Sequence, residues 1–76
     1  GKFQLYRLLR LVRMLAARAF DNPQITRVFA PIHDGNAGSM RVVEKNGFLR
    51  EGVQRKGAVK DGHVIDRVFW AKTRDD

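Results

Sequence analysis

The chain of 76 residues contains no cysteine, and this absence excludes both a disulfide framework and a zinc site with thiolate ligands. Histidine is nearly as scarce, because His33 and His63 are the only two, and they make a poor set of metal ligands. No apolar run approaches the ~20 residues that a membrane-spanning helix needs, and arginines interrupt the apolar start of the chain, unlike the core of a signal peptide. We therefore expect a cytoplasmic protein with no metal site and no membrane span.

Acidic residues are also few, with 8 Asp and Glu against 15 Lys and Arg, which gives a formal net charge of +7. A basic surface attracts phosphate groups over long distances, so the charge raises the question of a nucleic-acid or other anionic ligand. The same charge also occurs in proteins that are merely soluble. Hydrophobic residues at 43% and charged residues at 30% are typical of a folded domain. The length allows one small domain, which at this size is marginally stable on its own.

Residues 5–20 have the pattern of an amphipathic helix. At 3.6 residues per turn, Arg7, Arg10 and Arg13 fall opposite a broad apolar face. That face consists of Leu5, Leu8, Leu9, Leu11, Val12, Leu15, Ala16, Ala19 and Phe20. The sequence Asp-Asn-Pro at 21–23 ends the helix, because Asn and Pro favour a turn and Pro cannot donate a backbone hydrogen bond.

A strand and a second, short helix follow. Residues 25–32 are rich in β-branched and aromatic side chains and predict a strand. Asn36 is a suitable N-cap for the next helix, since its side chain can accept from the backbone N–H two or three residues further on. Met40 and Val43 mark the inner face of this helix. Gly47, after an asparagine, supplies the left-handed exit that helix ends favour.

Residues 48–59 and 63–71 predict two strands, and the pair Asp61-Gly62 between them is a strong signal for a tight hairpin turn. The second of these strands is mostly apolar on both faces, so we expect it inside the sheet and covered on both sides. Residues 72–76 read as a polar tail. The order helix, strand, helix, strand, strand predicts an α+β fold with only three strands of its own.

The segment from Asn36 to Phe48 carries a family resemblance. Asn36-x-x-Ser39, the run RVVEKNGF over residues 41–48 and the pair Glu51-Gly52 resemble the C-terminal half of GNAT-superfamily N-acetyltransferases, in the branch similar to ribosomal-protein-alanine N-acetyltransferases. The resemblance extends over residues 14–72. It implies the corresponding half of the GNAT acyl-CoA N-acyltransferase fold and the transfer of an acetyl group from acetyl-CoA, as cosubstrate, to a primary amine.

The resemblance also implies roles for two residues. The asparagine that matches Asn36 binds the pantetheine or pyrophosphate arm of the cofactor. The serine that matches Ser39 lies near the thioester sulfur, where it is a candidate catalytic proton donor to the leaving thiolate. Both residues have plain structural alternatives, because Asn36 is among the best helix caps and Ser39 could bond only to the nearby backbone.

One part of the family pattern is missing. The resemblance implies a pyrophosphate loop, Q/R-x-x-G-x-G/A, directly before the helix at 5–20, and a strand before that loop, but the chain contains neither. We therefore interpret residues 1–76 as a single partial GNAT domain, and we expect little or no catalysis from this chain alone. Self-association through the open edge of the sheet is one way to supply the missing strands.

The alternative function is a small basic binding module. Arg7, Arg10 and Arg13 on one helix face could contact nucleic-acid phosphates, and such binding would weaken steeply with salt. We regard this alternative as weaker, because no aromatic or amide side chains lie among the arginines to read bases. A helix lying on a membrane surface is a third reading of the same pattern.

Overall fold

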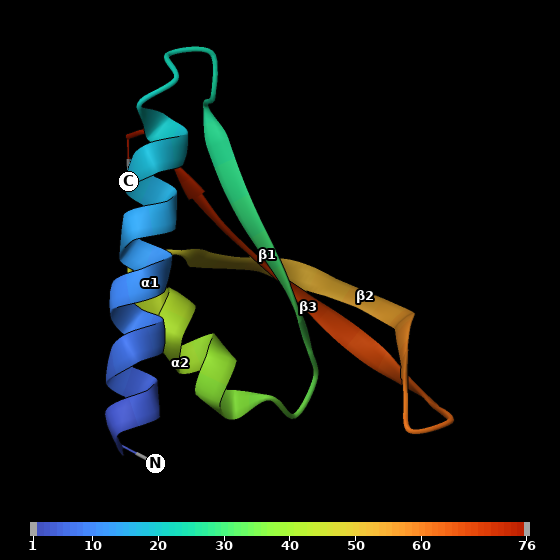
Figure 1. Ribbon diagram of the computed structural model, residues 1–76. Helices are drawn as coiled ribbons and strands as arrows, with labels where there is room; N and C mark the ends of the chain where they lie inside the picture. Colours follow the sequence, from blue (N-terminus) through green and yellow to red (C-terminus); the bar gives the residue numbers. More distant parts are fainter. Residues whose placement is uncertain (1, 76) are drawn as a thin grey trace.

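The structure, a computed structural model, describes residues 2–75 and has the predicted order of elements (Figure 1). These are α1 (Lys2–Phe20), β1 (Arg27–His33), α2 (Ala37–Lys45), β2 (Leu49–Lys60) and β3 (His63–Thr73). The α+β prediction is confirmed. Helix α1 begins three residues earlier than the apolar pattern indicated, since residues 2–4 contain no helix breaker and extend the same hydrogen-bonded backbone.

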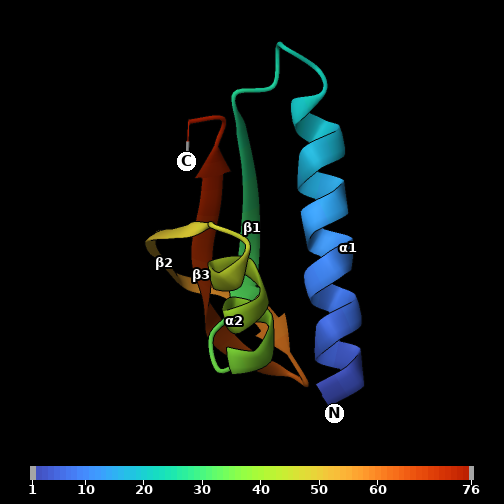
Figure 2. The ribbon, with the colours of Figure 1, turned by 90° about the vertical axis from the view of Figure 1, so that its left-hand side faces the viewer.

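The three strands form one antiparallel sheet in the order β1-β3-β2. The doubly apolar strand is therefore central, as predicted, with Val68 and Trp70 buried on one face and Ala71 on the other. Both helices lie on the face of Val68 and Trp70 (Figures 1 and 2). On the opposite face Phe29 and Leu49, which flank Ala71 in the register, are 59% and 60% exposed. The expectation of two covered faces is thus wrong within residues 2–75.

The hydrophobic core lies between the two helices and this face of the sheet. Its buried members are Ala16, Ile32, Val43, Phe48, Val68 and Trp70. Helix α1 contributes only one of them, because the narrow sheet supports just one stripe of the helix. Leu8, Leu11 and Leu15, which we had placed on the packed face, are exposed. On α2, Val42 is buried as well as Val43.

The hairpin of β2 and β3 is long and extends away from both helices (Figure 1). Its turn has positive φ angles at Asp61 (52°) and Gly62 (78°), which is the two-residue turn that the sequence predicted. A second irregularity lies in β2 between Gln54 and Ala58. There Lys56 has a φ of 56°, and its backbone N–H donates to Asp66 Oδ1 at 3.0 Å.

Residues 72–74 do not form the polar tail that the sequence indicated. Lys72 and Thr73 belong to β3. Arg74 donates from Nη1 to the carbonyl oxygen of Phe20 at 2.9 Å, and from Nη2 to the carbonyl oxygens of Asn22 and Ile25 at 2.8 and 2.6 Å. Arg74 thereby holds the loop between α1 and β1 in place, and this contact fixes the orientation of α1 relative to the sheet.

Candidate functional site

The first turn of α2 carries both residues that the family resemblance selected. Asn36 caps the helix: its Oδ1 accepts from the backbone N–H of Ser39 at 3.2 Å, as the sequence predicted. The N–H groups of Ala37 and Gly38 are therefore the remaining donors of the first turn that have no partner inside the helix. No acidic residue lies in this turn. The turn is consequently a cluster of donors with the partial positive charge of a helix N-terminus, which favours an anion or a carbonyl oxygen.

Ser39 is half-buried, and its hydroxyl makes no hydrogen bond within residues 2–75. It lies one helical turn before Val43, so the two side chains share one side of α2. Val43 belongs to the core and faces α1 and β1. The hydroxyl of Ser39 is thus a free donor on the α1 side of the helix.

The other end of α2 is anchored by a residue whose importance the sequence did not reveal. Asn46, only 7% exposed, donates from Nδ2 to the carbonyl oxygen of Val42 at 2.9 Å and to that of Leu9 in α1 at 3.1 Å. A side-chain amide is one of the few groups that can bond to the backbone of two helices at once. The sequence signal was the doublet Asn-Gly, which we had interpreted only as a helix exit.

The exit itself is a Schellman motif. The N–H of Phe48 donates to the carbonyl oxygen of Val43 and that of Gly47 to Glu44, at 3.0 and 3.1 Å, with Gly47 at a φ of 85°. Lys72 of β3 places its Nζ 2.9 Å from the carbonyl oxygen of Asn46, where a cation is stabilised by the helix dipole. Helix α2 is therefore fixed to α1 and to the sheet, and the position of its first turn is fixed with it.

An apolar hollow of about 180 Å³ lies between α1, β1 and α2. Its walls include Val12 and Leu15 from α1, Val28 and Ala30 from β1, and Val43 from α2. The hollow is open on one side. Because Val43 lies on the same side of α2 as Ser39, a ligand that entered the hollow along α2 would pass the Ser39 hydroxyl.

The outer edge of β1 borders this hollow. At the two ends of the β1–β3 ladder, the N–H of Asp34 donates to Asp66 O (2.9 Å) and that of Arg74 to Thr26 O (3.1 Å). Directly opposite residues of an antiparallel pair alternate between hydrogen-bonded and non-hydrogen-bonded positions. Because Thr26 and Asp34 are both hydrogen-bonded to their partners, the even-numbered residues of β1 form the backbone hydrogen bonds to β3. The backbone groups of the odd-numbered residues 27–33 point to the free edge. Pro31 is one of these, so its missing N–H costs the ladder nothing.

The remaining predicted residues lie elsewhere. Arg7, Arg10 and Arg13 are exposed along α1 and form no ion pair within the described residues. Between residues 2 and 75 no three His, Asp or Glu side chains gather as a metal site. Neither helix described is long and apolar enough to cross a membrane.

Comparison with known proteins identifies the family. Residues 9–49, more than half of the chain, match the family model of the acetyltransferase (GNAT) domain. The chain is 41% identical over 65 residues to a probable N-acetyltransferase, YjcK, of Bacillus subtilis strain 168, and the match covers 86% of this chain and 36% of that protein.

Solved structures agree with this match. A probable acetyltransferase superposes with a TM-score of 0.82 at 31% identity, over 88% of this chain and 38% of the other. The ribosomal-protein-S5-alanine acetyltransferase of Vibrio fischeri superposes with a TM-score of 0.81 at 26% identity, over 90% of this chain and 37% of the other.

This chain therefore spans between a third and two fifths of the length of these relatives. The relatives are named as acetyltransferases and give no support to the nucleic-acid alternative. The resemblance predicted from the segment 36–48 is confirmed, and the chain belongs to the GNAT acetyltransferase family.

Proposed function

We propose that this chain is the C-terminal part of an N-acetyltransferase and provides one wall of its acetyl-CoA site, so that the complete site transfers an acetyl group to a primary amine. The observation that carries the proposal is the capped first turn of α2, which holds a free Ser39 hydroxyl one helical turn before Val43. Val43 lines an apolar hollow that is bordered by the edge strand β1. The donors of this turn suit the carbonyl and phosphate oxygens of the cofactor, and the hollow suits its alkyl segments.

In this proposal Asn36 has two functions that do not compete. Its Oδ1 is occupied by the cap to Ser39, and this bond fixes the plane of the side-chain amide. Its Nδ2 group carries two N–H donors, and neither donor has a hydrogen-bond partner between residues 2 and 75. We infer that Nδ2 donates to an oxygen of the pantetheine or pyrophosphate arm. The cap would thus orient the donor, and in this proposal capping and ligand contact are compatible.

Ser39 would act at the sulfur of the thioester. Bound acetyl-CoA would supply an acetyl group whose C–S bond breaks as the C–N bond to a neutral amine forms, and the proton that the amine loses would pass to water. A hydroxyl is a far weaker acid than a thiol, whose pKa is about 8.5. Ser39 would therefore stabilise the departing thiolate by donating a hydrogen bond, and any proton that it transferred would be replaced from solvent.

The remaining parts of the site must come from outside these 76 residues. The chain contains no glycine-rich loop that could cradle the phosphates with backbone N–H groups. The free edge of β1 is suited to a further strand, supplied by a preceding segment or a second chain. We propose a cytoplasmic location for the assembled enzyme. The 76-residue chain alone should show little turnover of acetyl-CoA.

The test is a chimera in which this chain replaces the matched segment of the B. subtilis relative. Release of free thiol from acetyl-CoA, with an amine that the parent enzyme accepts, should reach a rate within about tenfold of the parent. Changing Ser39 to Ala should lower kcat by about 10²-fold, as expected for the loss of one donor to a developing negative charge. A folded chimera in which S39A retains full kcat would contradict the proposed role.

Asn36→Asp and Asn36→Ala separate the two functions of Asn36. Aspartate is as good a cap as asparagine, so N36D should keep the stability of the helix, whereas N36A should lose about 1 kcal/mol. Aspartate cannot donate from Nδ2 and repels phosphate, so we expect N36D to raise KM for acetyl-CoA at least tenfold, as N36A also does. An N36D chimera with unchanged KM would show that Asn36 is only a cap.

A further inference from the structure

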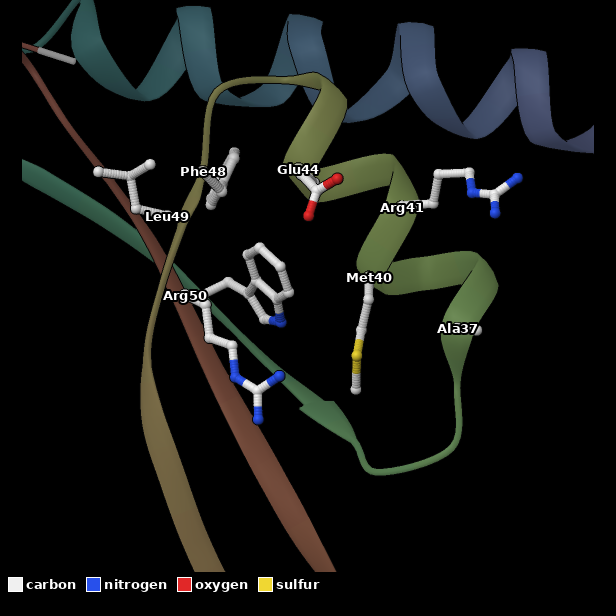
Figure 3. A pocket seen from close by; sticks show the side chains of 8 residues that line it. Ala37, Met40, Arg41, Glu44, Phe48, Leu49 and Arg50 are labelled. Carbon is white, nitrogen blue, oxygen red and sulfur yellow. The ribbon is translucent and has the colours of Figure 1, made fainter.

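A second hollow, of about 470 Å³, lies on the other side of α2, between this helix and the beginning of β2 (Figure 3). Met40 and Glu44, one turn apart, line it from α2, and Arg50 lines it from β2. At 3.6 residues per turn Met40 and Glu44 lie about 100° and 140° around the helix from Ser39. The hollow therefore lies on a different side of α2 from the Ser39 hydroxyl, although Phe48 lines both hollows.

Trp70 in the wall of this hollow carries an unpartnered polar group. The residue is only 6% exposed, and its Nε1 is shielded from solvent without a hydrogen-bond partner within the described residues. Buried indole N–H groups normally have a partner, because a buried donor that loses its bonds to water without replacement destabilises the fold. Met40 and Arg50, which line the same hollow, are long and flexible side chains that can move to admit an acceptor.

The charged groups around the hollow are equally unpaired. The side chains of Glu44 and Arg50 form no ion pair or hydrogen bond within residues 2–75. Figure 3 shows Met40 and Arg50 running in the same direction on opposite sides of the hollow, with the carboxylate of Glu44 above them on α2. Arg41, on the same helix, extends away from them (Figure 3).

We propose that this hollow binds a small monocarboxylate with an apolar body. The carboxylate would accept from the guanidinium of Arg50 and from Nε1 of Trp70, which satisfies the orphaned donor. The apolar body would lie against Met40 and Phe48, which line the same hollow. Glu44 in the wall of the hollow would repel a second carboxylate of the ligand, so the ligand should carry a single negative charge.

The experiment uses the fluorescence of Trp70, which is the only tryptophan in the chain. The 76-residue chain is titrated with phenylacetate, and with phenylacetamide as the neutral analogue of the same shape. We expect saturable binding of phenylacetate with a dissociation constant on the order of 1 mM, as suits a ligand of this size in an open hollow. Phenylacetamide should bind at least tenfold more weakly.

Arg50→Gln and Arg13→Gln form a matched pair, because both residues are exposed, both substitutions remove one positive charge, and Arg13 on α1 does not line the hollow. R50Q should weaken phenylacetate binding at least tenfold, while R13Q should leave it within twofold of the unchanged chain. Equal weakening by both variants would mean attraction to the net positive charge alone and would overturn the proposal. Equal affinity for phenylacetate and phenylacetamide, or no saturable signal, would also overturn it.

Discussion

Replacing Asn46 with alanine should destabilise the chain more than any other single polar substitution. Asn46 is only 7% exposed, and its Nδ2 donates to the carbonyl oxygens of Val42 and Leu9. Alanine removes both bonds and leaves a small void where the amide was. The change therefore loosens the attachment of α2 to α1 and with it the position of the first turn of α2.

The magnitude follows from the two bonds. Each intramolecular hydrogen bond contributes about 0.5–1.5 kcal/mol net, and a void of this size adds a few tenths. The loss of unfolding free energy should thus be about 2–3 kcal/mol. A domain of this length has a total of only about 4–11 kcal/mol, so N46A removes a large share.

Urea unfolding followed by Trp70 fluorescence and by circular dichroism measures this loss, since the midpoint falls while the slope is unchanged. Asn22→Ala is the matched control. Its side chain is exposed and makes one local bond, to the N–H of Gln24 at 3.0 Å, so N22A should cost under about 1 kcal/mol. An N46A variant as stable as N22A would refute the view that Asn46 holds the two helices together.

Three further substitutions test the packing around the site by the same urea assay. Gly47→Ala should cost about 1–2 kcal/mol, because φ is 85° and the new Cβ would lie 3.4 Å from Nζ of Lys72; a neutral result would mean that the exit turn relaxes freely. Arg74→Gln loses the donors to three carbonyl oxygens and should cost about 1–2 kcal/mol, with faster amide exchange in the loop before β1; unchanged exchange there would contradict the clamp. Glu51→Gln breaks the exposed ion pair with Arg27 and should cost at most about 1 kcal/mol, a loss that disappears in high salt; a larger, salt-independent loss would show a structural role for the pair.

The local elements were predictable because their signals are short-range. The cap at Asn36, the exit at Gly47 and the hairpin turn at Asp61-Gly62 each depend on a few neighbouring residues, and all three have the predicted geometry. The central position of β3 was also predictable, since a strand with apolar residues on both faces is typical of a sheet interior.

Long-range contacts were not predictable in the same way. Nothing in the local sequence shows that Asn46 reaches Leu9, which is 37 residues away, or that Arg74 reaches Phe20, which is 54 residues away. The exposure of Leu8, Leu11 and Leu15 was missed for a related reason. Periodicity shows that a helix has an apolar face, but it does not show how wide a surface is present to cover that face.

The candidate site was predictable only through the resemblance. Asn36 and Ser39 have ordinary local explanations, and the sequence motif alone selected them. The structure adds that Ser39 and the apolar hollow lie on one side of α2, next to the free edge of β1. No sequence pattern indicated that Nε1 of Trp70 would lack a hydrogen-bond partner within the described residues.

Titration of the 76-residue chain with acetyl-CoA, followed by amide NMR, tests the central claim most directly. We expect the largest changes in amide chemical shift at residues 36–39, in the first turn of α2. Smaller changes should occur at Val43 and Val28, which line the apolar hollow. Desulfo-CoA should change the chemical shifts of the phosphate-facing amides as much as acetyl-CoA does. It should change the shift of the Ser39 amide less, because it lacks the sulfur atom. Changes confined to the arginines of α1, or spread evenly over the basic surface, would contradict the assignment of this turn to acetyl-CoA.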